Sequence, residues 1–138
     1  MTNAARAHPL DLERRLLQAA FILAGFVPVT AGLSGVLIGP SFIDGTLGSP
    51  SVDSHTRYLS GLLLAIGLAF WSFVPRIEQE TSRVRLLTAL VAVGGLARLV
   101  SLIAVGAPSQ GMLGGLVMEL VVTPLLCLWQ SRIARARP

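Results

Sequence analysis

The chain of 138 residues contains one cysteine, two histidines and no lysine. The single cysteine, Cys127, cannot form an intramolecular disulfide, and we interpret it as a small residue packed in the last apolar segment. The histidines, His8 and His55, do not have the spacing of a metal-binding pair. The sequence also has no Cys-x-x-Cys motif, no phosphate-binding glycine loop and no recognisable Ser/His/Asp set. These absences favour a protein that is not an enzyme, with no metal site, no catalytic residues and no cofactor.

Charged residues are scarce as well, at 13% of the chain against 53% hydrophobic residues. The mean hydropathy of +0.72 leaves too little polar surface to solvate a globular domain of this size. The net charge is +4, and arginine is the only basic residue besides the two histidines, because the sequence has no lysine. These arginines form short clusters between long apolar runs, which is unlike the basic face of a nucleic-acid-binding domain. The composition therefore predicts an integral membrane protein without a nucleic-acid partner.

Four apolar segments approach the ~20 residues that cross ~30 Å of hydrocarbon as a helix. They cover residues 16–39, 58–74, 86–105 and 112–129. The second is the shortest, but Arg57 can snorkel from its first turn and Trp71 can sit at the opposite interface. The connecting segments are too short to hold a soluble domain. We predict an all-α, four-transmembrane-helix bundle that forms a single domain over residues 1–138.

The positions of the arginines predict the orientation, because arginines that flank a span are retained in the cytoplasm. Three clusters share one side of the predicted membrane: Arg6, Arg14 and Arg15; Arg76, Arg83 and Arg85; Arg132, Arg135 and Arg137. The other side receives Asp44, Asp53 and Arg57. This distribution predicts that both termini are cytoplasmic and that the protein is a multipass protein of the cytoplasmic (inner) membrane. The pair Arg14–Arg15 also resembles an export signal, but the long apolar run after it favours an uncleaved anchor.

Small residues recur along the predicted helices at steps of three and four positions. In the first helix they are Gly25, Pro28, Gly32, Gly35 and Gly39, and further glycines follow at positions 94, 95, 111, 114 and 115. Helices in lipid approach each other through such residues, because contact between small side chains supplies the packing energy. We interpret these stripes as packing faces, in preference to the lining of a substrate path.

Two charged residues, Arg98 and Glu119, fall inside predicted spans. A lone charge near the middle of the bilayer costs at least ~2.5 to 3.5 kcal/mol, so neither is expected to be unpaired. Counted from the turn near Pro108, the two lie about level in an antiparallel hairpin. Pro124 cannot donate a backbone hydrogen bond and is expected to leave the carbonyl of Leu120 beside the acid without its helical partner. The sequence predicts an Arg98–Glu119 pair.

His55 and Arg57 mark the start of the second predicted span, with Asp53 or Ser54 as the expected N-cap. The third and fourth spans turn on the same outer side. We therefore expect Arg57 and His55 to share the outer half of the bundle with Arg98 and Glu119 and to form a polar pocket open to the outside.

These residues carry a resemblance, over nearly the whole chain, to a family of small bacterial four-span membrane proteins, domain of unknown function 4345. The stretch 54–61 resembles the start of its second helix, 94–101 the core of its third, and Met118–Glu119 the acid of its fourth. The resemblance implies a compact four-helix fold in which these polar positions are shared features. It implies no reaction.

Three interpretations of the polar residues remain open. In the structural one, Arg98 and Glu119 lock two helices together and His55 and Arg57 mark an interface. In the one that we favour, the protein is a non-catalytic binding or accessory protein. Its partners are then membrane lipids, an amphipathic small molecule such as a quinone-like ligand, or a larger membrane complex. The alternative is a small-molecule transporter or membrane enzyme in which Glu119 accepts a proton beside Arg98.

Overall fold

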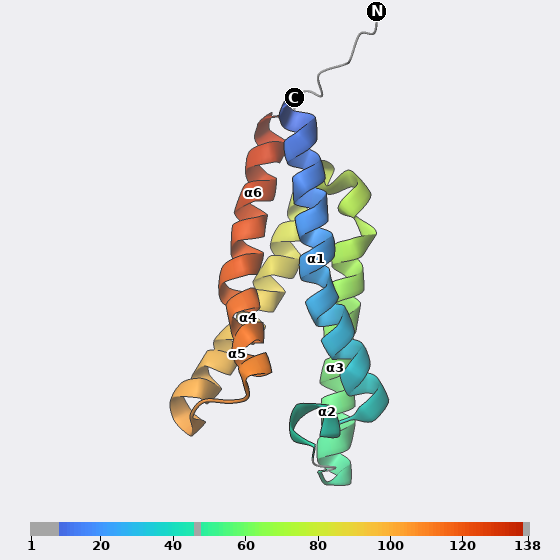
Figure 1. The fold of residues 1–138 in the computed structure, drawn as a ribbon, viewed down its shortest axis with the longest axis vertical. Helices are drawn as coiled ribbons and strands as arrows, with labels where there is room; N and C mark the ends of the chain where they lie inside the picture. The colour runs from blue at the N-terminus through green and yellow to red at the C-terminus, as the bar shows by residue number, and fades with distance from the viewer. Residues whose placement is uncertain (1–8, 46–47, 137–138) are drawn as a thin grey trace, which may run out of the picture. The chain divides into compact units, whose positions relative to one another are not determined.

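A computed structural model describes residues 9–45 and 48–136, and the regular secondary structure within these ranges is entirely helical (Figure 1). The α-helices are α1 (Pro9–Ile38), α2 (Ser41–Asp44), α3 (Pro50–Ser72), α4 (Thr81–Val105), α5 (Gln110–Val117) and α6 (Thr123–Ala136). The short 3-10 segment η1 (Val74–Gln79) precedes α4, and one π-helical turn, η2 (Met118–Val122), joins α5 to α6. The predicted all-α class is confirmed. His8, Arg6 and Arg137 lie outside the described residues.

Within the described residues, three helical stretches are long and apolar enough to cross a membrane: Asp11–Ile38, Thr81–Val105 and Gln110–Ala136. They contain most or all of the first, third and fourth predicted spans, and they indicate a membrane protein. Most of the second predicted span, residues 58–72 of 58–74, lies in α3, which is not among the three. Its first two turns are polar, so roughly fifteen apolar residues remain, fewer than a typical span requires. The fourth crossing stays a prediction.

Helix α3 begins earlier than the sequence predicted. Ser49 is its N-cap, and the Ser49 hydroxyl accepts a hydrogen bond from the N–H of Val52 at 3.3 Å. Pro50 occupies the first helical position, where its missing N–H costs nothing. The prediction of Asp53 or Ser54 as the cap was therefore wrong, because a serine followed by proline, four to five residues upstream, is a stronger start signal. Asp53 instead lies in the first turn, where an acidic side chain is favoured by the helix dipole.

The described helices group into two compact units. Unit 1 combines the chain up to Phe21 with residues 74–138, and unit 2 covers Ile22–Phe73. The first part of α1 thus belongs to unit 1 and the remainder to unit 2. The prediction of one domain over the whole chain is not tested by this grouping.

Unit 2 is a close-packed pair of helices, the later part of α1 against α3. A Cβ atom on Gly32 would lie 2.8 Å from the Ser60 carbonyl oxygen and equally close to the Leu64 Cα, so only glycine fits. At the other end of the pair, the Trp71 indole N–H donates to the Ile22 carbonyl at 3.1 Å. The predicted packing face of α1 is confirmed, since Gly25 and Gly35 also lie directly against side chains of α3.

Unit 1 has its most buried residues where α1, η1, α4 and α6 meet. The fully buried side chains there are Leu17, Ile77, Val84, Gln130 and Ile133. The amide of Gln130 donates to the Ile77 carbonyl at 2.7 Å and to the Thr81 hydroxyl at 3.0 Å. From α1, Arg14 pairs with Glu78 at 3.0 Å. These bonds fix the η1 segment between the helices, so the predicted charged turn is an ordered part of the core.

Candidate functional site

The Arg98 and Glu119 side chains meet inside unit 1, one from α4 and the other from η2. The Arg98 Nε lies 3.0 Å from Oε1 and 2.9 Å from Oε2 of the Glu119 carboxylate. The Glu119 side chain is 15% exposed and the Arg98 side chain 35% exposed. Both residues belong to helical stretches that can cross a membrane. The predicted pairing is confirmed, and ligand contact at these residues stays a prediction.

The pair is held by one nitrogen of the guanidinium only. The Nε–H donates to Oε1, whereas Oε2, although close to the same nitrogen, is buried and has no hydrogen-bond partner among the described residues. The Arg98 Nη1 lies 2.8 Å from the sulfur of Met112 in α5. A thioether is a weak acceptor, and the guanidinium has five N–H donors. Arg98 is therefore anchored by Glu119 and Met112 with most of its donors uncommitted within the described part of the chain.

The helix forms a π turn, which is wider than an α-helical turn, at Glu119. The Thr123 N–H donates to the carbonyl of Met118, five residues earlier, and the Thr123 hydroxyl donates to the same oxygen at 2.8 Å. Pro124 follows directly and lacks the N–H that an α-helix would use at this point. The sequence predicted that the Leu120 carbonyl would lack its helical hydrogen-bond donor. In the structure the helix forms a π turn over Met118–Val122 at this point. Such single turns recur at functional sites of helices.

Glycines control the space around the pair. A Cβ on Gly95 would lie 2.7 Å from Leu120 and 2.9 Å from the Glu119 Cβ, so this glycine lets α4 approach η2. A Cβ on Gly115 would meet only the Arg98 Cζ, at 4.0 Å. Gly94, Gly111 and Gly114 have no described atom within 4 Å of such a Cβ. The predicted packing role is thus confirmed at Gly95 and is not observed at these three positions among the described residues.

Arg57 lies in unit 2 and caps the end of α1. Its Nε and Nη2 donate to the two carboxylate oxygens of Asp53 at 2.9 and 3.2 Å. Its Nη1 donates to the carbonyls of Val36 and Leu37, which α1 leaves unpaired at its C-terminus. The hydrogen bond and charge of Asp53 raise the pKa of Arg57 above its ordinary value, against the smaller effect of burial. All three nitrogens of this predicted site residue are engaged within unit 2.

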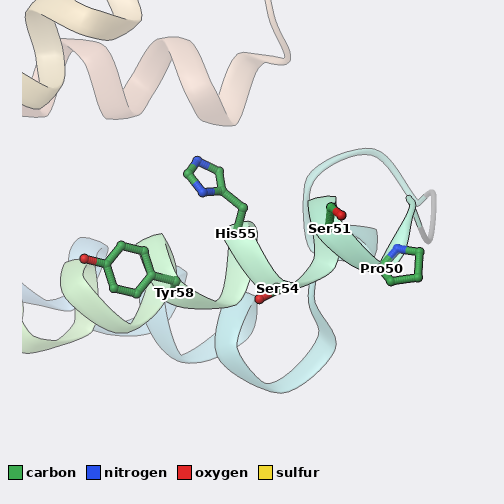
Figure 2. A pocket seen from close by; sticks show the side chains of 5 residues that line it. All are labelled: Pro50, Ser51, Ser54, His55 and Tyr58. Atoms are coloured by element: carbon green, nitrogen blue, oxygen red, sulfur yellow. The ribbon is translucent and has the colours of Figure 1, made fainter.

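His55 precedes Arg57 by two residues and therefore lies on a different side of α3. It lines a shallow, open depression with Pro50, Ser51, Ser54 and Tyr58, and Figure 2 shows its imidazole standing away from the helix. Arg57 is not among these lining residues. The structure brings Arg98 to Glu119 but places His55 and Arg57 in the other unit. The predicted pocket shared by all four stays a prediction.

Two functional candidates were not singled out from the sequence. Met112 sits at the start of α5, and nothing in its type signals a contact with arginine. Gln130 is fully buried, and its Oε1 has no hydrogen-bond partner among the described residues. A glutamine directly after an apolar run was a signal that could have found it. No group of three or more metal-ligating side chains occurs within residues 9–45 and 48–136.

Comparison with known proteins identifies a family without giving a reaction. No curated protein and no solved structure matches the chain. Residues 16–130 match the family described as Domain of unknown function (DUF4345). Since the match covers most of the 138 residues, the chain belongs to this family.

Proposed function

We propose that this chain is a small multipass protein of the bacterial inner membrane, with four spans and both termini in the cytoplasm. The three arginine clusters support the orientation. Helix α3 has 23 residues and is therefore roughly 34 Å long. The part from Arg57 to Trp71 is only about 21 Å long, so the helix crosses if the Arg57 side chain snorkels out to its interface. Arginine and tryptophan at the two ends suit the two interfaces of a bilayer.

Within that topology we propose a non-catalytic binding or accessory role for an amphipathic molecule. The observation that carries the proposal is the Arg98–Glu119 pair, which joins two stretches that can span a membrane. Two charges placed inside spans are costly and usually serve a binding or transport task. A guanidinium that is 35% exposed and donates only to one carboxylate and one thioether among the described residues can bind a further acceptor. A closed structural brace would instead use all three nitrogens, as Arg57 does with Asp53 and the carbonyl of Val36.

A second candidate is a transporter or membrane enzyme in which Glu119 accepts a proton. The π turn at Met118–Val122 and the buried Oε2 of Glu119, which has no hydrogen-bond partner among the described residues, favour it, because both features recur at functional sites. Four helices are few for alternating access, and the sequence has no evident inverted repeat. The binding role is therefore the preferred proposal.

Mass spectrometry of molecules that co-purify with the intact protein tests the proposal. The wild-type chain is expected to retain one class of amphiphile well above its share of the host membrane. The Glu119→Gln variant keeps the shape of the side chain but removes its charge, and it is expected to lose that class while remaining folded. Glu80→Gln, which removes the charge of a carboxylate paired with the exposed Arg83, is the matched control and is expected to retain it. A lipid extract identical to bulk membrane for the wild type would contradict the binding role.

A further inference from the structure

The two arginines that were predicted as site residues use their donors very differently. Arg57 forms a two-pronged bond with Asp53 and places its remaining nitrogen on the end of α1. Arg98 donates from Nε to Glu119 and from Nη1 to a sulfur. Of its five N–H groups two are engaged, so three have no partner within the described part of the chain, including both on Nη2.

The position of Arg98 along α4 makes these unused donors costly. Arg98 lies seven residues before the end of the helix at Val105, which corresponds to roughly 10 Å of helix. Lipid hydrocarbon offers no acceptor to an N–H group at that depth, and an unsatisfied group there costs several kcal/mol. An oxygen acceptor on a bound molecule would satisfy the exposed edge of the guanidinium.

Charge selects the kind of acceptor. Arg98 and Glu119 together are neutral, with Oε1 and Oε2 both about 3 Å from the guanidinium Nε. A second anion at the same guanidinium would face the repulsion of this carboxylate in a medium of low dielectric constant. A neutral oxygen, such as the carbonyl of an ester or a quinone, accepts the N–H without that repulsion.

The glycine at position 115 leaves the guanidinium accessible from α5. A Cβ there would meet only the Arg98 Cζ, at 4.0 Å, so the residue opposite the charged group has no side chain to cover it. Gly114, its neighbour, has no described atom within 4 Å of a Cβ and does not approach Arg98. A larger side chain at 115 would therefore lie over the guanidinium, whereas one at 114 would not.

We infer that the Nη edge of Arg98 beside Gly115 binds the carbonyl oxygen of a neutral amphiphile, with Glu119 and Met112 holding the guanidinium in place. The inference rests on the proposed binding function and names the chemistry of its ligand. The carbonyl can belong to an acyl ester or to a quinone, and both present the same acceptor to the arginine.

Infrared spectroscopy of isotope-labelled carbonyls tests this inference on the full chain in a maltoside detergent, which contains no carbonyl. The probes are methyl oleate, a decyl-substituted benzoquinone and, as the charged counterpart of the ester, ionised oleate. The labelled band of at least one neutral probe is expected to shift to lower frequency on the wild-type protein, and which probe responds distinguishes the two sources. Oleate is expected to bind more weakly than methyl oleate.

Two variants test whether the guanidinium of Arg98 binds the probe, independently of the stability of the fold. Arg98→Lys keeps a charge for Glu119 but loses the planar fork, and the neutral probe is expected to bind about tenfold to a hundredfold more weakly. If that variant does not fold, Gly115→Leu provides the same test by covering the guanidinium. Gly114→Leu is its matched control and is expected to bind the probe as the wild type does.

The outcomes separate the inference from the proposed function. Undiminished binding in both Arg98→Lys and Gly115→Leu would overturn the arginine site while leaving a binding protein. Tighter binding of oleate than of methyl oleate would overturn the neutral ligand only. If no probe binds and the purified wild type carries no enriched amphiphile, the inference and the proposed function both fail.

Discussion

At the scale of single residues, Arg57 engages more of its hydrogen-bond donors with described residues than Arg98 does. Arg57 donates at all three nitrogens to Asp53 and to the end of α1. Arg98 relies on the Glu119 carboxylate and one sulfur. Both side chains are partly exposed, so the difference lies in the donors that each local structure leaves unused. This contrast is the physical basis for treating Arg98 as the binding residue.

Removal of one charge from the Arg98–Glu119 pair should destabilise the protein more than removal of both. Glu119→Gln leaves a guanidinium in a span without its counter-charge, and we expect a loss of roughly 1–3 kcal/mol in the free energy of unfolding. The double variant Arg98→Gln/Glu119→Gln should recover part of this loss. Thermal unfolding in detergent of the wild type, both single variants and the double variant measures the coupling. Additive effects of the two substitutions would show that the contact contributes nothing.

The two adjacent glycines of α4 should respond oppositely to alanine. Gly94→Ala meets no described atom and should stabilise the helix by about 0.5–1 kcal/mol, because glycine is a poor helix former. Gly95→Ala would press on Leu120 and on the Glu119 Cβ and should cost about 1–3 kcal/mol. Comparison of the two melting temperatures checks this directly. Equal shifts of the same sign would contradict the close approach of α4 and η2.

At the scale of helices, the contact between α1 and α3 depends on glycine opposite backbone. A Cβ on Gly32 would lie 2.8 Å from the carbonyl oxygen of Ser60, and neither backbone can move without separating the helices. We expect Gly32→Ala to lower the free energy of unfolding by several kcal/mol. Gly61→Ala is the control: its Cβ would have its nearest neighbour at 4.0 Å, so it should not lower the free energy of unfolding. A melting temperature of Gly32→Ala at or above that of the wild type would refute this packing.

The helix positions and the glycine-rich packing face of α1 were predictable from the sequence, because both follow from local patterns. Apolar length located α1, α4 and the α5–α6 stretch, and glycine spacing located the packing face of α1 but not its partner, α3. The start of α3 was missed because the Ser49–Pro50 signal lies in a polar loop that the hydropathy pattern ignores. The π turn at Glu119 could be predicted only in part, since Pro124 reveals a missing donor but not how the backbone compensates.

The side-chain partners were harder to predict than the helices. The Arg98–Glu119 contact followed from counting residues on either side of a short turn, which works because a tight hairpin fixes the register. Met112 and Gln130 were missed because their partners, a guanidinium and the Ile77 carbonyl, come from segments whose packing no local pattern encodes.

At the scale of the whole molecule, the number of crossings decides which side of the membrane the Arg98–Glu119 pair approaches. If α1, α3, α4 and the α5–α6 stretch all cross, the turn after Val105 lies outside the cytoplasm. If α3 does not cross, the same turn lies inside and the start of α4 lies outside. A pocket that opens outward near Arg98 requires the first arrangement.

Labelling of single cysteines with a membrane-impermeant maleimide in intact cells tests this topology most directly. In a Cys127→Ser background, Ser109→Cys reports the turn between α4 and α5, and Ser82→Cys reports the start of α4. Four crossings with a cytoplasmic N-terminus predict that position 109 is labelled in intact cells and that position 82 is labelled only after permeabilisation. Labelling of position 82 in intact cells, with position 109 protected until permeabilisation, would contradict the four-span account.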